Sequence, residues 1–370
     1  MPQITGKTVY VLGAGASFHV GAPLLADFLV TARLLREGRE QLVHKDSFDR
    51  VFDWIDKLRG SSYYVEFDLD NLEHVFSLAE MGKQLKLEGA EQIFADLRYL
   101  VTETLDICRV KYEEKQLVPS ADYATFVTHL AGRNDEWRRL VGDQFHKDVL
   151  ISFNYDVSLD YAFNFKGIRF GYGFDGANTS DFVVLKLHGS TNWAMCRSCN
   201  SPELQIVPAS PIPPGHHIGP SLQSGESYKF KMVTNVLANT QCDKCRVVRR
   251  LEPYVIPPTW SKMVEGSPLQ KVWLRAVEEI KTAYQIVVIG YSMPPTDTFF
   301  QYLLTLGLQA NAGFHRVVVV NKDNSDALKE RYRRVFSRSL MDRGRLVFRM
   351  EREFEDFVNA GGMVQVATYV

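Results

Sequence analysis

A glycine-rich turn near the N-terminus has the residue types of a phosphate-binding loop. GAGAS at residues 13–17 directly follows a β-branched run at residues 8–12, and a helical pattern begins near residue 24. Glycines let backbone N–H groups approach an anion, and a helix N-terminus adds partial positive charge. A tight strand-to-helix connection that binds nothing has the same pattern. The sequence predicts a nucleotide site here, with that connection as the alternative.

An amide, a carboxylate and an imidazole accompany two further strand-like runs. Asn154 and Asp156 come at the end of residues 149–153, and His188 follows residues 183–187. Ligands bind outside the carboxyl ends of strands in an open parallel sheet, so these side chains can face one pocket. His188 can serve as a general base, because the ordinary pKa of histidine is near neutrality. The structural alternatives are an Asx turn or helix cap at Asn154–Asp156 and a hydrogen-bonded core histidine.

Polar turns also end the apolar runs at residues 285–289 and 316–320. GYS follows the first run and NKD follows the second. Turn chemistry explains each turn alone, whereas their joint placement at one edge of a sheet favours a binding crevice. The candidate residues in these turns are Gly290, Ser292, Asn321 and Asp323.

Two CxxC pairs supply the four thiolates of a tetrahedral zinc site. Protein ligands saturate such a site, so the zinc would be structural. Residues 200–241 separate the two pairs, which is longer than the usual ribbon spacing of about 15–20 residues. Four unligated thiols are the alternative, and disulfides suit a reducing compartment less well. The predicted ligands are Cys196, Cys199, Cys242 and Cys245.

The elements that must position these residues alternate between strands and helices. Near-continuous apolar runs are typical of parallel strands covered on both faces, and helical patterns near 268–283, 296–310 and 324–338 supply the covering layers. The sequence predicts an α/β fold, namely a Rossmann-like doubly wound parallel sheet with a helical insertion and a small zinc-binding module. The expected boundaries are 1–44 and 146–195 for the first two parts of the core, 45–145 for the helical insertion, 196–250 for the zinc-binding module, and 251–370 for the third part of the core with the C-terminal tail.

Composition and charge exclude several classes of protein. The chain has 370 residues, of which 45% are hydrophobic and 24% are charged, as in a soluble globular protein large enough to bury a cofactor. Its 43 Lys and Arg balance 44 Asp and Glu, so charge gives no indication of direct nucleic-acid or membrane binding. The N-terminus lacks the pattern of a signal peptide, and we expect a cytoplasmic protein.

Taken in order, these motifs resemble those of the sirtuin family. GAGAS followed by GAP is similar to the sirtuin GAGIS followed by GIP, with the same three-residue gap. FNYD resembles the family's QNID, LHGS its histidine motif, GYS its GTS, and VNKD its nucleotide-contacting asparagine segment. The two CxxC pairs resemble the sirtuin zinc ribbon. The resemblance covers about residues 8–26, 148–200 and 242–323.

The resemblance implies that NAD binds as a substrate beside a structural zinc ion. It implies that Asn154 and Asp156 position the nicotinamide ribose and carboxamide, and that His188 contacts the ribose hydroxyls as a base. The remaining cofactor-binding positions that it implies are Gly13, Ala14, Gly15, Ser17, Pro23, Gly290, Ser292, Asn321 and Asp323.

Two departures from the sirtuin pattern bear on the reaction. Leu24-Leu25-Ala26 stands where sirtuins have Asp-Phe-Arg, and prolines in residues 254–262 lack the N–H groups that a peptide substrate would pair with. With the large helical insertion, the chain resembles the bacterial sirtuin-like NAD glycohydrolases of anti-phage defence. Those proteins consume cellular NAD and commonly work as homo-oligomers or with a partner such as a hexameric ATPase. The resemblance thus implies cleavage of NAD to nicotinamide and ADP-ribose.

Two other functions stay open at this point. A zinc ribbon is not a general feature of the defence group, so an NAD-dependent protein deacylase or ADP-ribosyltransferase is the first alternative. The second is a non-catalytic sensor that binds NAD or ADP-ribose to control an assembly. Analysis of the reaction products separates these functions from hydrolysis.

Overall fold

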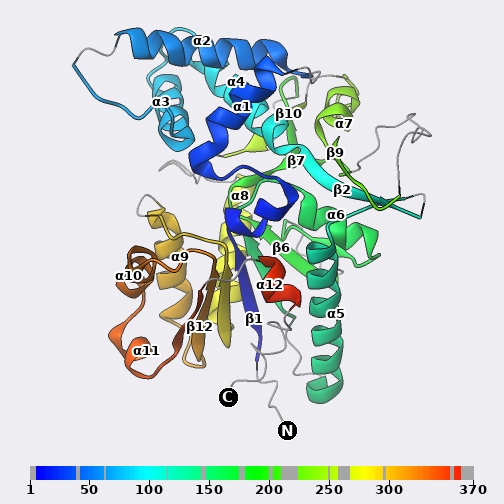
Figure 1. Ribbon diagram of the computed structural model, residues 1–370, viewed down its shortest axis with the longest axis vertical. Coiled ribbons are helices and arrows are strands. Elements are labelled where there is room, and N and C mark those ends of the chain that lie inside the picture. Colours follow the sequence, from blue (N-terminus) through cyan, green and yellow to red (C-terminus); the bar gives the residue numbers. More distant parts are fainter. Residues whose placement is uncertain are drawn as a thin grey trace.

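In the computed structural model, the chain folds around one seven-stranded parallel β-sheet, and a layer of helices lies beyond one end of this sheet (Figure 1). It describes residues 6–38, 42–61, 64–114, 116–142, 147–174, 180–199, 203–209, 224–248, 251–256, 267–294, 297–350 and 354–359.

Seven strands form the sheet in the order β13-β12-β11-β1-β4-β6-β5, and each neighbouring pair is parallel. After β1, the chain adds β4, β5 and β6 on one side of this strand, and it later adds β11, β12 and β13 on the other side. A change of winding direction of this kind leaves a crevice outside the carboxyl ends of the strands. The strands are β1 (Thr8–Leu12), β4 (Val149–Ser152), β5 (Phe170–Gly171), β6 (Phe182–Lys186), β11 (Gln285–Ile289), β12 (Arg316–Asn321) and β13 (Leu346–Met350).

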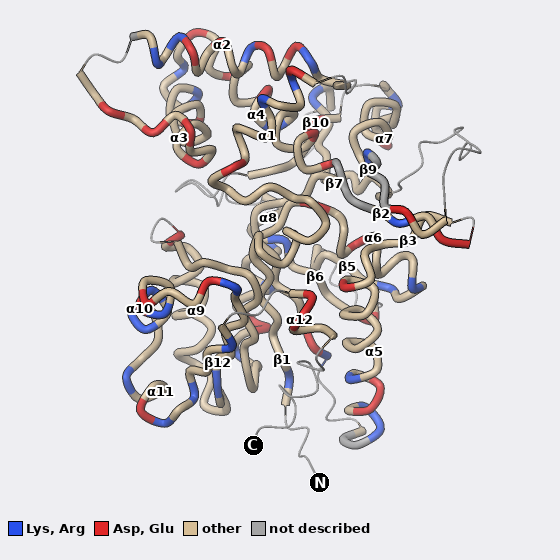
Figure 2. Tube along the Cα trace, viewed as in Figure 1, with Lys and Arg blue, Asp and Glu red and all other residues tan. Residues whose placement is uncertain are grey.

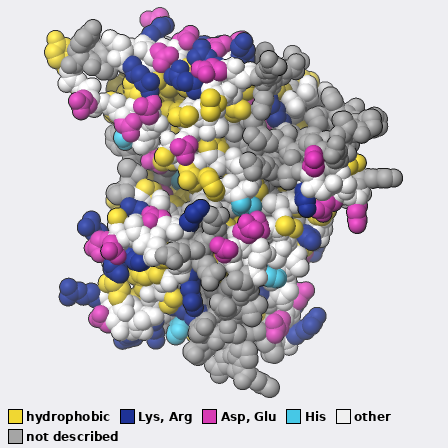
Figure 3. Space-filling model, viewed as in Figure 1, with side chains coloured by type: hydrophobic (Ala, Val, Ile, Leu, Met, Phe, Trp, Pro, Cys, Tyr) yellow, Lys and Arg dark blue, Asp and Glu magenta, His cyan; other side chains and the backbone are white. Residues whose placement is uncertain are grey.

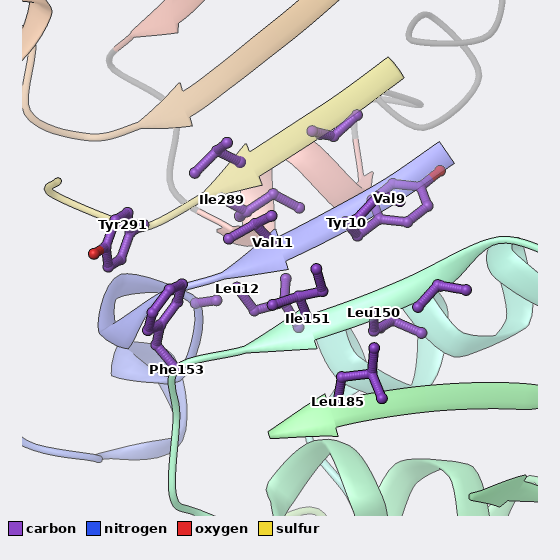
Figure 4. Packing of buried hydrophobic residues seen from close by; sticks show 14 of the residues in the cluster. Val9, Tyr10, Val11, Leu12, Leu150, Ile151, Phe153, Leu185, Ile289 and Tyr291 are labelled. Atoms are coloured by element: carbon purple, nitrogen blue, oxygen red, sulfur yellow. The ribbon is translucent and has the colours of Figure 1, made fainter. Parts of the chain in front are cut away.

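The central strands form because their residues can be buried on both sides. All five residues of β1 and all five of β11 are buried, which explains why these runs are continuously apolar rather than alternating. Figure 4 shows Val11 and Leu12 packed among the side chains of the neighbouring strands, with Ile151 on one side and Ile289 on the other.

Helices cover both faces of the sheet and confirm the doubly wound arrangement. α5, α6 and α12 pack together on one face, whereas α8 and α9 pack together on the other. Serine side chains cap several of these helices, and Ser120, Ser267 and Ser325 each accept a hydrogen bond from a backbone N–H in the first turn. The helices are α5 (Ala121–Val141), α6 (Ser158–Phe165), α8 (Pro268–Lys281), α9 (Thr298–Leu308), α10 (Asp326–Val335), α11 (Arg338–Asp342) and α12 (Phe354–Asn359).

A second group of helices, the helical unit, has a hydrophobic core of its own beyond the carboxyl ends of the strands. Val255 from the zinc-binding region belongs to this core, and Tyr155 from the sheet packs against it. The unit is therefore joined to the sheet next to the predicted site. Its members are α1 (Phe28–Glu37), α2 (Lys45–Ser61), α3 (Leu72–Gln84) and α4 (Ala90–Leu105).

Two small antiparallel sheets make up the zinc-binding region. β7 (Gly189–Cys196) lies between β10 (Leu251–Val255) and β8 (Gln205–Ile206). The second sheet has the order β3-β2-β9, and α7 (Thr234–Asn239) follows β9. Its strands are β2 (Ile107–Glu113), β3 (Gln116–Val118) and β9 (Ser227–Lys231).

This second sheet differs from the sequence-based expectation for residues 45–145. β2 and β3 lie inside the range predicted as a helical insertion, and β2 pairs with β9 more than 100 residues later in the chain. Such long-range pairing leaves little trace in local periodicity. α5, also within that range, packs on the main sheet rather than in the helical unit.

The charged residues are concentrated along the outer helices and loops of the trace (Figure 2). One stretch, Phe18–Glu37, is long and apolar enough to span a membrane by length and composition. In the fold this stretch is divided into short 3₁₀ turns and the ten-residue α1. Phe28, Leu29 and Ala32 of α1 are buried in the helical unit, whereas Val30 and Leu34 of the same helix are exposed.

Candidate functional site

A cavity of about 960 Å³ lies at the carboxyl edge of the sheet, between the sheet and the helical unit. This is within the size range of cofactor sites, about 300–1,000 Å³. Figure 3 shows hydrophobic side chains exposed over the helical unit and in the band where it meets the sheet. Apart from Gly13, which is buried beneath the cavity, the structure places every predicted catalytic and cofactor-binding residue in its lining. These residues are Ala14, Gly15, Ser17, Pro23, Asn154, Asp156, His188, Gly290, Ser292, Asn321 and Asp323.

The glycines of the N-terminal turn allow it to pack directly on the turn that follows β11. A Cβ atom on Gly13 would lie 2.5 Å from the Cα of Tyr291, and one on Gly15 would lie 2.9 Å from the Cα of Gly290. Gly290 has a φ of +62°, and a Cβ there would lie 2.4 Å from the backbone nitrogen of Ala16. Close backbone packing therefore accounts for these three glycines before any ligand is considered.

The backbone N–H groups of the turn are largely committed within the protein. Gly13 donates to the carbonyl of Ile289 and Gly15 to that of Gly290, while Ala16 and Ser17 donate within the turn. The Ala14 N–H is not engaged in these bonds, and Ala14 is exposed. It is the turn's best-placed donor to an anion.

The expectation that the turn opens an α-helix is wrong. Residues 14–16 and 18–20 form two 3₁₀ turns, and α1 begins only at Phe28. The left-handed Gly21 and the extended Leu24 interrupt the backbone before α1. The expected partial charge of an α-helix N-terminus is therefore not available at the turn.

The side chain of Asn154 is fixed by hydrogen bonds to this turn. Its Nδ2 donates to the carbonyl oxygen of Gly13 and to Oγ of Ser17, both at 2.9 Å. Ser17 in turn shares a 2.8 Å hydrogen bond with the hydroxyl of Tyr123. Because both hydrogens of the amide are engaged, Oδ1 of Asn154 is its atom that can accept a hydrogen bond from a ligand.

Asp156 and His188 reach the cavity from neighbouring strands, β4 and β6. Oδ1 of Asp156 accepts the backbone N–H of Ser158 at 3.0 Å, so the predicted Asx turn is present. His188 is buried and contacts the rings of Phe153 and Tyr155, with centroid distances of 5.2 and 5.7 Å. The Asx turn thus coexists with a position in the cavity lining, and His188 is a buried side chain that also lines the cavity.

Sequence reasoning missed an aromatic and acidic corner of the cavity next to His188. Phe153 stacks on Tyr291 with a centroid distance of 4.5 Å, and Figure 4 shows the two rings facing each other beyond the ends of their strands. The Tyr291 hydroxyl donates to Oδ2 of Asp297 at 2.6 Å. Burial, followed by the Asp297 carboxylate, raises the pKa of Tyr291 well above its ordinary value, so the hydroxyl stays protonated.

Acidic side chains outnumber basic ones in the lining. Glu73 of α3 comes from the helical unit, and its charge acts on both Tyr155 and Tyr291. No local sequence signal indicates that Glu73 lines the cavity, because only the fold brings α3 to it. The carboxylates of the lining are those of Asp68, Asp70, Glu73, Asp156, Asp297, Asp323 and Glu355, beside the cationic Lys322.

The turn after β12 forms the far side of the cavity. Nδ2 of Asn321 donates to the carbonyl of Tyr291 at 3.2 Å, and its Oδ1 accepts the N–H of Asp323. Hydrogen bonds from Ser325 lower the pKa of Asp323. Ser292 is exposed at the rim, and its carbonyl accepts from Nε of Arg331.

Leu24, Leu25 and Ala26 line the cavity together with Pro23. This wall is apolar where the sirtuin pattern would place an acid, an aromatic ring and an arginine. In the proline-containing segment at residues 254–262, Tyr254 and Val255 end β10, and residues 257–262 lie outside the described residues.

The four cysteines meet in the geometry of a zinc site. Their Sγ atoms all lie within 4.8 Å of one another, with Cys196 to Cys245 at 3.7 Å and Cys199 to Cys242 at 3.5 Å. Sulfur atoms around a tetrahedral zinc ion are separated by about 3.8 Å, since Zn–S bonds are about 2.3 Å. Pairing of β7 with β10 brings the two CxxC segments together. The residues present fit a structural zinc ion.

Comparisons with solved structures find similarity to several Sir2 homologues. The chain matches no known family model and no curated protein. A solved Sir2 homologue in complex with NAD is 16% identical, with a TM-score of 0.45, covering 99% of this chain and 92% of the other. A Sir2 homologue mutant in complex with 2'-O-acetyl ADP ribose is 16% identical, with a TM-score of 0.44 and coverage of 99% and 95%. A Sir2–p53 peptide–NAD+ complex is 13% identical, with a TM-score of 0.42 and coverage of 97% and 93%.

Proposed function

We propose that the protein is an NAD glycohydrolase that cleaves NAD to nicotinamide and ADP-ribose. The observation that carries this proposal is the convergence of Asn154, Asp156 and His188 on one cavity beside the glycine turn. The amide of Asn154 is held by two hydrogen bonds to that turn. An oriented amide, a carboxylate and an imidazole at a dinucleotide-sized cavity suit cleavage of an N-glycosidic bond.

The proposed reaction breaks the bond between the ribose C1 and the nicotinamide nitrogen, and the bonding electrons leave with nicotinamide. Positive charge develops on the ribose, and the Asp156 carboxylate and the acidic lining stabilise it. Oδ1 of Asn154 accepts a hydrogen bond from the attacking water, whose oxygen bonds to C1. His188, which contacts the ribose hydroxyls, takes up the proton that the water loses.

The zinc ion is outside this chemistry. Cys196, Cys199, Cys242 and Cys245 would hold it with no position left for water, so it stabilises the β7–β10 module. The same module is the feature that favours the second candidate, a protein deacylase or ADP-ribosyltransferase. A deacylase makes O-acyl-ADP-ribose only when an acylated peptide is present.

The biological role that we propose is depletion of NAD in bacterial anti-phage defence. It includes a cytoplasmic location and a homo-oligomer, alone or with a partner such as a hexameric ATPase. The resemblance of the motifs to defence-type NAD glycohydrolases supports this role, together with the apolar wall at Leu24-Leu25-Ala26.

Chromatographic analysis of NAD incubated with the full chain tests the proposed reaction. We expect nicotinamide release by the wild type and a loss of at least about 100-fold in Asn154→Ala. Asn311→Ala is the matched control, because Nδ2 of Asn311 likewise donates two hydrogen bonds, in this case to the backbone oxygens of Ile280 and Ala283, away from the cavity. Equal turnover in wild type and Asn154→Ala would remove this residue from the mechanism.

A further inference from the structure

A lysine is buried behind the proposed catalytic residues, at the end of β6. Its side chain is 2% exposed, and its partner Asp160 in α6 is 1% exposed. Nζ of Lys186 lies 2.9 Å from Oδ2 of Asp160. A charge this deeply buried is costly unless it is paired and hydrogen-bonded. The reaction proposed above does not use this ion pair.

Two further hydrogen bonds join the Lys186 ammonium to the loop that carries Asn154 and Asp156 and to the start of β7, directly after His188. Nζ donates to the carbonyl oxygen of Asp156 at 2.7 Å and to Oγ of Ser190 at 2.8 Å. The ion pair with Asp160 adds an electrostatic contact, in which Oδ2 of Asp160 accepts no hydrogen bond. One bond ends on the loop of Asn154, and another ends two residues after His188.

The loop after β4 and the start of β7 are also hydrogen-bonded to each other around the lysine. The carbonyl oxygen of Tyr155 accepts the N–H of Thr191 at 3.0 Å and Oγ of Ser190 at 3.2 Å. Asp160 is held in its turn, because the buried Tyr172 hydroxyl donates to its Oδ1 and accepts Nδ2 of Asn192. The lysine therefore lies at the centre of this network, with hydrogen bonds to both segments.

We propose that Lys186 and Asp160 are positioning residues that set the separation and orientation of Asn154, Asp156 and His188. This inference rests on the proposed function, because it assigns the ion pair to that reaction. Misplacement of catalytic groups by about 1 Å can reduce a rate by about 100-fold. The pair does not touch the substrate, so its removal should lower kcat and leave binding of the product's ADP-ribose part intact.

The double variant Lys186→Met/Asp160→Asn tests this inference, because it removes both charges and so leaves neither charge buried without its partner. The matched control is Arg133→Met/Asp148→Asn, which removes a second buried ion pair, at 2.6 Å, from the opposite end of the sheet. We expect kcat for nicotinamide release to fall by about 10- to 100-fold in the first variant only. The Kd for ADP-ribose should change less than about twofold, because the binding contacts are kept. If the wild type is active and the folded double variant has the same kcat, the positioning role of Lys186 and Asp160 is overturned, while the proposed function stands.

Two additions keep the test decisive. If the double variant does not fold, Ser190→Ala removes one acceptor of the ammonium and should lower kcat in the same direction; wild-type kcat would count against the network. If the wild type releases no nicotinamide, the proposed function fails, and amide hydrogen exchange then judges the inference. Residues 154–157 and 189–192 should exchange faster in the double variant while β1 and β11 stay protected, and equal protection would overturn it.

Discussion

The two ends of the central sheet use polar residues in opposite ways. At the amino end, Arg133 pairs with Asp148 at 2.6 Å and donates to Oγ1 of Thr8 at 2.8 Å, while Thr8 also accepts from Gln285. These groups are therefore hydrogen-bonded or ion-paired to one another within the protein. At the carboxyl end, polar side chains from the ends of five strands line a cavity of about 960 Å³. Polar groups that a fold leaves facing open space are candidates for function, whereas closed networks indicate stability.

The residue types show the same contrast. Glycines at the carboxyl end remove side chains where two turns meet, and Gly290 takes a backbone conformation with φ of +62°. The Lys186 network at that end is buried like the one around Arg133, but its bonds run to Asp156, which lines the cavity, and to Ser190, two residues after His188. Location relative to the cavity, rather than bond type, separates a stabilising pair from a positioning pair.

The largest expected effect is the loss of nicotinamide release when His188, at the carboxyl end, is replaced. His188→Ala should reduce nicotinamide release by at least about 100-fold, because general acid–base catalysis contributes about 10²–10⁴-fold. Steady-state nicotinamide release per folded protein is the measurement. A rate within twofold of wild type would show that the imidazole is only a core side chain.

The zinc module extends the comparison, because it is attached to the carboxyl end through β7. Cys199→Ser should lose most of the zinc, measured as about one ion per chain in the wild type, and should destabilise the module by about 5 kcal/mol or more. Hydrogen exchange should rise over β7 and β10 before it rises at β1. A stable wild-type protein without metal would contradict the zinc assignment.

The amino end should respond in stability and not in activity. Arg133→Met leaves the buried Asp148 carboxylate without its partner, which costs about 3–5 kcal/mol. Chemical denaturation measures the loss. The kcat per folded molecule should stay at the wild-type value, and a large fall in kcat would mean that the two ends of the sheet are coupled.

The smallest expected effect is at the glycine contact. Gly290→Ala places a Cβ atom 2.4 Å from a backbone nitrogen at a positive φ, with a cost of about 1–3 kcal/mol from backbone strain. Gly132→Ala in α5 is the control, since its Cβ meets nothing within 4 Å, and it should stabilise by about 0.5–1 kcal/mol. Thermal denaturation of both variants checks the sign, and equal shifts would contradict the packing account.

The sequence predicts the buried strands well and the small sheets poorly. β1 and β11 match the expected ranges to the residue, because a run buried on both faces is apolar throughout. The sequence does not predict β2 and β9, because their pairing depends on residues that are far apart in the chain. The edge strand β13 is only half-buried and was not anticipated.

The candidate site follows the same rule. Residues 13–17, Asn154 and His188 can be singled out because they follow strand-like runs. The roles of Lys186 and Asp297 depend on which loops meet in the fold, and nothing near them in the chain indicates those neighbours. Sequence patterns therefore locate the edge of the sheet at which ligands bind, while the structure is needed to identify the supporting residues.

Mass-spectrometric product analysis of NAD in isotopically labelled water is the most direct test of the proposed hydrolysis. The proposal predicts equal amounts of nicotinamide and ADP-ribose, with the label in ADP-ribose and none in nicotinamide. It also predicts that Asn154→Ala lacks both products. Nicotinamide release that occurs only with an acylated peptide, or the absence of release from a wild type that binds NAD, would contradict it.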